Sequence, residues 1–495
     1  MKTATNAMPE PAAPPSARHR RRTLVLLGAI FVVVCVSRAV VFPASIWEQD
    51  EAYFAAAVVE IDLDASSPHP PFFPLWIGIG KAAGLVGCAP ATGLQTASAV
   101  FGSLIFFPLV ALWSRIMKPG LAMAATALGL AAPGVWLLSG RAFSGTAATA
   151  MLVTALACWT RPIQDRRWLA AGSVAAGLAV LIRPHFVLAV AVVTIVMLAR
   201  LDRRLRLALV VPAVAVTTAG GAAFVCAAGG TAAVAAALSE HAALHFGALS
   251  EAARGLLDSG LARVLGHPIG SVGWCGLALW GAWIVLRSST KRVAGLPVVA
   301  ALGSLVILVF GLSNPAHPRY AVPLVILSCG FVVIALSRML SDRWTLVLVT
   351  VAICAAAAMV LPTAAIYRQE ASPPLRALAH ADRLAAQREG VVVIDRSLHS
   401  FVLLREATEA TSAPTIFDYV VGLGASPPAP ASRTVMVFDD NHQSLLVASE
   451  SRWTFTCSDE LLRRLSQDRF LDVTVADGAT LENRSGANGP FVILD

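Results

Sequence analysis

The sequence predicts a polytopic α-helical membrane protein with a small α/β domain after its last span. Of the 495 residues, 57% are hydrophobic and only 14% are charged, whereas soluble domains have roughly 25% charged residues. Apolar runs recur from residue 23 to about residue 366, and most are near the ~20 residues that cross a lipid core as a helix. After Tyr367 the composition becomes that of a soluble domain.

Residues 1–22 are rich in Ala, Pro and Arg, and we expect a disordered, basic cytoplasmic tail. The basic cluster that ends at Arg22 precedes an apolar run, as in a secretory signal peptide. That run is longer than the apolar part of a signal peptide, and no small-residue cleavage site follows it before Trp47. We therefore expect a first membrane span that is retained.

About eleven membrane helices are expected between residues 23 and 366. The predicted spans are 23–41, 96–114, 121–139, 144–160, 168–182, 185–200, 206–228, 270–287, 294–312, 319–337 and 344–366. Residues 72–88 are also apolar, but this segment is short, glycine-rich and bounded by prolines. A full crossing here would invert every later loop and put the basic loops outside. We therefore expect the segment to be re-entrant or to lie at the membrane surface, which is tolerated where protein covers its backbone.

The Lys and Arg residues of the membrane domain fall mainly in alternate loops. Those on the N-terminal side include Arg115, the pair Arg166 and Arg167, and the pair Arg203 and Arg204. The positive-inside rule then puts the N-terminus on the cytoplasmic side of a bacterial inner membrane, and an odd number of spans makes the C-terminal domain periplasmic. This sorting accounts for the net charge of +8 without a nucleic-acid partner.

The first outer loop, residues 42–95, begins with a helix-start signal. Pro43 is followed by Ser45 and, three residues later, by Glu48, which predicts a helix from Ile46 with Ser45 as its cap. Its second turn carries Asp50 and Glu51. Three residues supply an apolar stripe that is expected to lie along the membrane surface: Tyr53, Phe54 and Val58.

The same loop holds six acidic residues and no Lys or Arg before the rigid sequence His69-Pro70-Pro71. Such a run is often only a solvated acidic loop. The helix cap, the aromatic neighbours and the prolines favour a site instead. His69 can either hydrogen-bond a substrate or Asp50, or simply shape the loop.

Four motifs carry a resemblance to a known class. They are Asp50-Glu51-Ala52-Tyr53, His69-Pro70-Pro71, the stretch from Gly177 to Arg183-Pro184, and Pro318-Arg319-Tyr320 with Pro323 behind it. In this order, the chain resembles the GT-C membrane glycosyltransferases, in particular the protein O-mannosyltransferases and lipid A aminoarabinose transferases of glycosyltransferase family 39. The resemblance extends over roughly residues 20–366 and identifies 23–366 as a GT-C-like catalytic domain.

The resemblance implies an inverting transferase that moves a hexose or pentose from a polyprenyl phosphate to a lipid, protein or glycan acceptor on the outer face. Such a reaction needs a base beside the acceptor and a positive clamp on the departing phosphate. The resemblance makes Asp50 the base and Glu51 its support. The expected substrate-binding residues are Tyr53, His69, Arg141, Arg183, His185, Arg319 and Tyr320.

Two of the expected clamp residues have structural alternatives. Arg183, in a tight outer turn, can bind phosphate or reach lipid headgroups. Arg319 can bind phosphate or mark the start of a helix. The chain has Phe143-Ser144-Gly145 where many relatives place an acidic residue, so a divalent metal is possible but unsupported. The eight cysteines have no metal-ligand spacing, and the sequence assigns no cofactor with certainty.

Two further regions are expected outside the membrane. The long loop 229–269 is predicted to be a mobile cover of paired helices. Residues 367–495 are predicted to form the α/β domain, with strands at 391–395, 434–438, 470–475 and 491–494 and helices at 374–389 and 458–468. That domain covers the site, contacts the acceptor, or only stabilises the protein.

Two other functions suit a polytopic protein of this composition. One is a transporter or lipid flippase, which should show inverted internal repeats that we do not find in the sequence. The other is a non-catalytic scaffold for the assembly of envelope glycans. Transfer from a polyprenyl-phosphate sugar distinguishes the enzyme from both.

Overall fold

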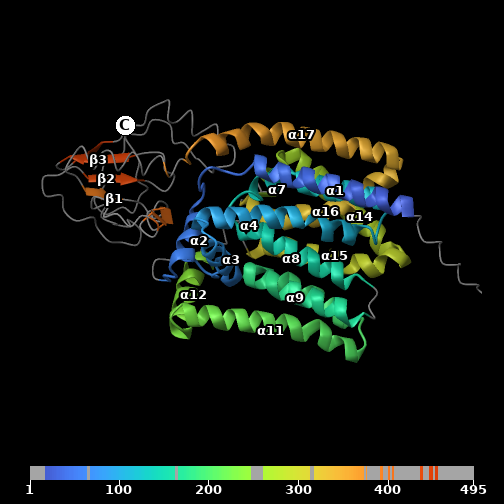
Figure 1. Cartoon of the computed structure of the whole chain (residues 1–495), viewed down its shortest axis with the longest axis horizontal. Coiled ribbons are helices and arrows are strands. Elements are labelled where there is room, and N and C mark those ends of the chain that lie inside the picture. The colour runs from blue at the N-terminus through green and yellow to red at the C-terminus, as the bar shows by residue number, and fades with distance from the viewer. Residues whose placement is uncertain are drawn as a thin grey trace, which may run out of the picture.

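The computed structural model describes residues 17–63, 67–161, 165–246, 260–312 and 317–372, with short stretches beyond. Those stretches are 375, 391–393, 400–401, 404–405, 408, 435–438, 445–449 and 452–454. Most of the long helices run in roughly the same direction and form a bundle, with the strands beyond one of its ends (Figure 1). The described part of the chain is therefore mostly helical.

The helices follow the apolar runs of the sequence. They are α1 (Ala17–Val40), α2 (Gln49–Val59), α3 (Pro74–Leu85), α4 (Pro90–Leu104), α5 (Phe106–Trp113), α6 (Pro119–Ala131), α7 (Pro133–Leu138), α8 (Ser144–Trp159), α9 (Arg166–Ile182), η1 (Pro184–Phe186), α10 (Val187–Leu198), α11 (Arg203–Ala227), α12 (Thr231–Phe246), α13 (Gly260–Leu265), α14 (Pro268–Arg287), α15 (Ser289–Ile307), the π-helical turn η3 (Leu308–Leu312), α16 (Pro318–Met339) and α17 (Asp342–Gln369). Each of the eleven predicted spans is helical. The span predicted at 121–139 is broken at Pro133, which starts α7 and has no N–H to continue the ladder of α6.

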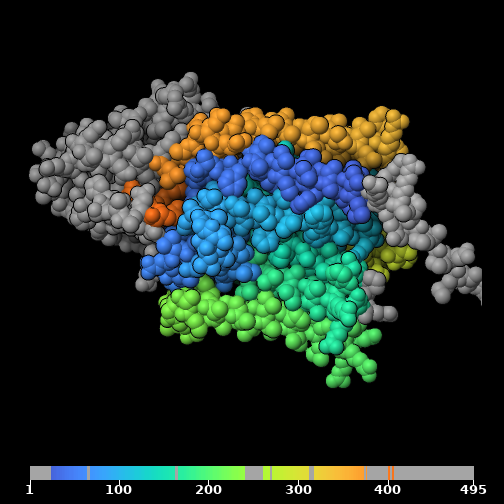
Figure 2. Space-filling view, viewed as in Figure 1, coloured from blue at the N-terminus to red at the C-terminus, as the bar shows by residue number. Residues whose placement is uncertain are grey.

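Five helical segments of the described chain are long and apolar enough to cross a membrane. They are Pro90–Trp113, Arg203–Ala227, Ser289–Phe310, Pro318–Met339 and Asp342–Gln369, and four further apolar helices are shorter. The chain is thus a membrane protein, while eleven crossings and the orientation of the termini stay predictions. In its most apolar window, α16 is 83% buried, whereas α11 and α17 are 11% and 22% buried. The two less buried helices, α11 and α17, lie along two edges of the molecule, where they can face lipid (Figure 2).

The first outer loop folds against one end of the bundle. There α2, α3 and α12 lie at the end opposite to the first residues of α1 (Figure 1). The segment 72–88, expected to be re-entrant or surface-lying, contains the 12-residue helix α3. A helix of that length spans about 18 Å, which is less than the ~30 Å of a lipid core. Trp76 of α3 is buried and donates a hydrogen bond to the carbonyl of Ala142 at 3.2 Å.

Two expectations about α2 are wrong. The helix begins at Gln49 and not at Ile46, because Glu48 is the N-cap and forms a capping box with Glu51. The Ser45 hydroxyl instead accepts a hydrogen bond from the Ser372 N–H at 3.0 Å. The apolar stripe does not lie along the membrane surface, since three side chains pack inside the protein: Tyr53, Phe54 and Val58.

The described C-terminal residues include four strands, β1 (Val391–Val393), β2 (Val435–Phe438), β3 (Leu445–Ser449) and β4 (Arg452–Thr454). They form one sheet in sequence order, with β1 parallel to β2 and the later pairs antiparallel. Strands were predicted at the first two positions, and those predicted at 470–475 and 491–494 lie outside the described residues, as do both predicted helices apart from residue 375. The α/β domain as a whole therefore stays a prediction.

The loop 229–269 contains α12 and α13, and residues 247–259 between them lie outside the described part. Its role as a cover remains a prediction.

Candidate active site

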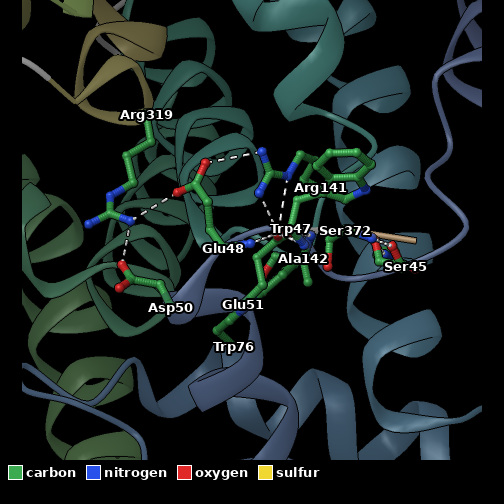
Figure 3. A network of polar contacts seen from close by, with 11 residues as sticks. Ser45, Trp47, Glu48, Asp50, Glu51, Trp76, Arg141, Ala142, Arg319 and Ser372 are labelled. Atoms are coloured by element: carbon green, nitrogen blue, oxygen red, sulfur yellow. Dashed lines mark hydrogen bonds and ion pairs between the residues drawn. The ribbon is translucent and has the colours of Figure 1, made fainter. Parts of the chain in front are cut away.

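A buried ion-pair network fixes the start of α2 (Figure 3). Glu51 has no exposed surface, and one of its oxygens accepts hydrogen bonds from the backbone N–H groups of Trp47 and Glu48, both at 3.1 Å. The same oxygen pairs with Arg141 Nη2 at 2.5 Å, while the other accepts the Ala142 N–H at 2.7 Å. Because the carboxylate is fully bonded, Glu51 anchors the first turn of the helix.

Arg141 is the cationic partner in this network. Its guanidinium is 2% exposed, and Nη1 lies 3.0 Å from Glu48 Oε1. Burial alone disfavours the charged form, but the carboxylates of Glu51 and Glu48 outweigh it and raise the pKa of Arg141. Arg141 therefore stays charged and neutralises two carboxylates behind α2.

Asp50 is held from the other side by Arg319, in the first turn of α16. Arg319 Nη1 lies 2.5 Å from Asp50 Oδ2 and 3.5 Å from Glu48 Oε2, so Glu48 stands between two guanidinium groups (Figure 3). Burial would raise the pKa of Asp50, but the positive charges around it, Arg319 foremost, lower it to about 2. The Asp50 carboxylate is consequently ionised at neutral pH.

Histidines and aromatic rings form a chain of contacts that starts at Asp50. His69 Nε2 lies 3.6 Å from Asp50 Oδ2, and its ring stacks on Phe54 with centroids 5.2 Å apart. The centre of the Phe73 ring lies 5.3 Å from that of His69 and 6.2 Å from that of His185. The His185 ring centre in turn lies 6.1 Å from that of Tyr320. Residues from the first loop, the turn after α9 and the start of α16 thus meet in one place.

Arg183 lies beside this group at the N-terminal end of α8. Its side chain is 4% exposed, its guanidinium lies 4.8 Å from the centre of the Tyr320 ring, and Nη1 is 3.5 Å from Ser144 Oγ. Among the described residues no carboxylate forms an ion pair with it, and burial lowers its pKa to about 10. A Cβ on Gly145 would come 3.2 Å from Nη1. A buried guanidinium against a positive helix end is an arrangement that favours an anion.

The structure brings together six of the predicted site residues, namely Asp50, His69, Arg183, His185, Arg319 and Tyr320. The Tyr53 ring is near them, 6.1 Å from His69. Arg141 and Glu51 bind each other on the side of α2 away from this group. Glu51 therefore contacts Arg141 and backbone amides, and not Asp50. The roles of all these residues remain predictions.

Sequence reasoning missed four residues with direct contacts in or behind the site. Glu48 was assigned to the interior of α2, although its spacing to Glu51 also fits a capping box. The other three come close to the site only through the fold: the His317 ring lies 6.3 Å from that of Tyr320, centre to centre, Gly145 lies against Arg183, and Tyr367 lies against Arg141. Within the described residues, no group of three or more His, Cys, Asp or Glu side chains is placed to hold a metal ion.

Residues 85–228 match the model of the Alg9-like mannosyltransferase family. This segment runs from the end of α3 to just beyond α11 and contains Arg141 and Arg183. The family differs from the group suggested by the motifs, but both are GT-C glycosyltransferases, and the resemblance to that class is confirmed. No curated protein sequence matches the chain.

Several solved structures align with this chain at TM-scores below 0.5. ArnT from Cupriavidus metallidurans bound to undecaprenyl phosphate aligns with a TM-score of 0.48 and 21% identity, over 79% of this chain and 75% of that one. The oligosaccharyltransferase of Archaeoglobus fulgidus tethered with an acceptor peptide aligns with a TM-score of 0.47 and 12% identity, over 77% of this chain and 63% of that one. The mycobacterial arabinofuranosyltransferase AftD aligns with a TM-score of 0.42 and 18% identity, over 77% of this chain and 31% of that one. These likenesses assign no substrate to this chain.

Proposed function

We propose that this membrane protein is an inverting glycosyltransferase that takes a sugar from a polyprenyl phosphate and passes it to a lipid, protein or glycan acceptor. The observation that carries the proposal is an ionised, partly exposed carboxylate, Asp50, in one group with two guanidinium groups at one end of the helical bundle. Arg319 is bound to Asp50, whereas Arg183 is buried close by and pairs with no carboxylate among the described residues. A base and a phosphate clamp are the two elements that the reaction needs.

In the proposed reaction, an acceptor hydroxyl attacks the anomeric carbon on the face opposite to the phosphate. The bond between that carbon and the phosphate oxygen breaks, and the electron pair leaves with the polyprenyl phosphate. Asp50 takes the proton of the acceptor hydroxyl, which yields a neutral glycoside with inverted configuration. Arg183 and Arg319 stabilise the charge that develops on the leaving phosphate.

Arg183 is the stronger candidate for binding the donor phosphate before the reaction. It has no carboxylate partner among the described residues, whereas Arg319 is shared by Asp50 and Glu48. Arg183 also lies against the first turn of α8, where Gly145 leaves room for its guanidinium, and the N-terminal end of a helix favours an anion. A phosphate here also attracts Arg319 away from Asp50, which raises the proton affinity of Asp50 when a base is needed.

We place the reaction on the outer face of a bacterial inner membrane. Two observations support this placement. The loops with most Lys and Arg residues were assigned to the N-terminal side, and the candidate site lies at the end of the bundle opposite to the start of α1 (Figure 1).

The test uses purified full-length protein in lipid nanodiscs with radiolabelled polyprenyl-phosphate sugars and separate lipid, protein and glycan acceptor fractions. We expect the parent protein to transfer label with inversion, detected by NMR of the product, and Asp50→Asn to lose transfer. A parent protein that moves the intact lipid-linked sugar across vesicles without cleaving it is a flippase. One that does neither with any donor of the panel contradicts the transferase proposal and favours a scaffold.

A further inference from the structure

The end of the last membrane helix, α17, is bonded to the segment that leads into α2. The Tyr367 carbonyl accepts a hydrogen bond from the Ala44 N–H at 2.9 Å. Just past the helix, the Ser372 N–H donates to Ser45 Oγ at 3.0 Å (Figure 3). These two bonds fix the path of residues 44–45, immediately before the Glu48 cap.

The Tyr367 side chain adds a packed contact behind the site. Its ring is 2% exposed and lies 4.4 Å from the ring of Trp47, centre to centre. The Arg141 guanidinium also lies over this ring, 5.6 Å from its centre. Val41, Leu137, Val360 and Ala364 complete this small apolar cluster. The ring therefore contacts both the chain before α2 and the cation that binds the start of α2.

Little free space is left around these contacts. The cavity bounded by Glu48, Arg141, Pro318 and Tyr367 has a volume of about 10 Å³, which is room for one water molecule at most. A smaller side chain at position 367 consequently lets Arg141 and Trp47 move. Since Arg141 binds both Glu51 and Glu48, such a movement reaches the first turn of α2, where Asp50 is located.

From this geometry, we propose that Tyr367 is a positioning residue, which acts through Arg141 to set the place of Asp50. The inference rests on the proposed transferase function. Tyr367 does not belong to the group of Arg183, His185 and Tyr320, because its contacts lie on the Arg141 side of α2. The last membrane helix, which leads into the C-terminal domain, thereby becomes part of the support of the candidate base.

The experiment compares Tyr367→Leu with Tyr367→Phe in full-length protein in nanodiscs. We expect Tyr367→Leu to lower kcat about tenfold or more, since small displacements of a reacting group have large effects on rate. The donor KM should stay within about twofold of the parent value, because the phosphate clamp is elsewhere. Tyr367→Phe keeps the ring, so its kcat should stay near the parent value. The matched control is Leu361→Ala on the same helix, whose side chain is 48% exposed.

A double variant tests the route through Arg141. If Tyr367 acts through Arg141, the double variant Tyr367→Leu with Arg141→Lys should lose much less kcat than the product of the two single fold-losses. An unchanged kcat in Tyr367→Leu, an equal rise in donor KM, or independent losses in the double variant overturns the positioning role. A parent protein without transfer activity contradicts the proposed function instead, so the two failures are distinguishable.

Discussion

Arg319 and Asp50 form an ion pair that joins the first turn of α16 to the first turn of α2, with Nη1 2.5 Å from Oδ2. The pair therefore binds together two helices that are far apart in the sequence. It keeps the candidate base ionised, since Arg319 is the largest of the positive influences that lower the pKa of Asp50 to about 2. It also makes Asp50 a weak base until Arg319 is drawn toward another anion.

The first prediction concerns pH. With Arg319 in place, Asp50 remains ionised down to acidic pH, so kcat/KM should show no loss due to Asp50 between about pH 8 and pH 5. In Arg319→Gln, the positive charge that opposes the effect of burial on Asp50 is lost, so the pKa of Asp50 rises. The acid limb of the kcat/KM profile should then move up toward neutral pH. The pH profile of kcat/KM measures it, with Arg343→Gln as control. Superimposable profiles for parent and Arg319→Gln speak against the coupling.

The same pair has a consequence for stability. Because its folded-state pKa lies below the ordinary value of 3.8, ionised Asp50 stabilises the folded protein above that pH. This contribution disappears as the pH falls through about 2 and is therefore complete at neutral pH.

The second prediction separates chemistry from binding at Asp50. Asp50→Asn keeps the shape of the side chain but removes the base, so kcat should fall by roughly 10²- to 10⁴-fold. Binding of the donor, measured with the labelled lipid in the absence of acceptor, should be retained. Glu60→Gln is the control, as Glu60 is an exposed acidic residue at the end of the same helix. Transfer at the parent rate in Asp50→Asn rejects Asp50 as the base.

The third prediction assigns Glu51 to stability. Glu51→Ala leaves the buried guanidinium of Arg141 with one carboxylate and removes the acceptor of three backbone N–H groups. Loss of one partner of a buried ion pair costs about 3–5 kcal/mol. We expect lower expression and a clearly lower Tm in detergent, with little change in Glu60→Ala. If Glu51→Ala has the parent Tm but no activity, Glu51 acts in the reaction and not as an anchor.

Much of the fold follows from the sequence, because apolar run length and loop charge report directly on membrane helices. The start of α2 illustrates where this reasoning stops. Ser45 and Glu48 both belong to plausible capping patterns, and the choice between them is made by Arg141 and Ser372, which are distant in sequence. Local signals cannot contain that information.

The candidate site shows the same limit. Asp50 and Arg319 were both named from motifs, yet nothing in either motif predicts that they bind each other. Arg141 was predicted to clamp phosphate like Arg183, since both are arginines in outer loops. What distinguishes them is that two carboxylates neutralise Arg141, whereas no carboxylate pairs with Arg183 among the described residues.

The fourth prediction follows from that difference. Arg183→Ala should raise the KM for the donor by about tenfold or more, because a buried charge-assisted contact to phosphate is lost. The KM for the acceptor should change much less. Arg183→Lys keeps the charge but not the fork of donors and should be intermediate. Equal losses for donor and acceptor indicate that Arg183 has a structural role.

The last prediction uses the glycine beneath Arg183. In Gly145→Ala, the new Cβ comes 3.2 Å from Arg183 Nη1 and 3.6 Å from the Arg319 carbonyl, so the guanidinium must shift by a few tenths of an ångström. Alanine is otherwise favourable in a helix, and the Tm should not fall. We therefore expect a higher donor KM in a stable protein. Gly303→Ala, where the added Cβ meets no atom within 4 Å, should behave like the parent. A parent-like donor KM in Gly145→Ala shows that the position of Arg183 against α8 is not used in donor binding.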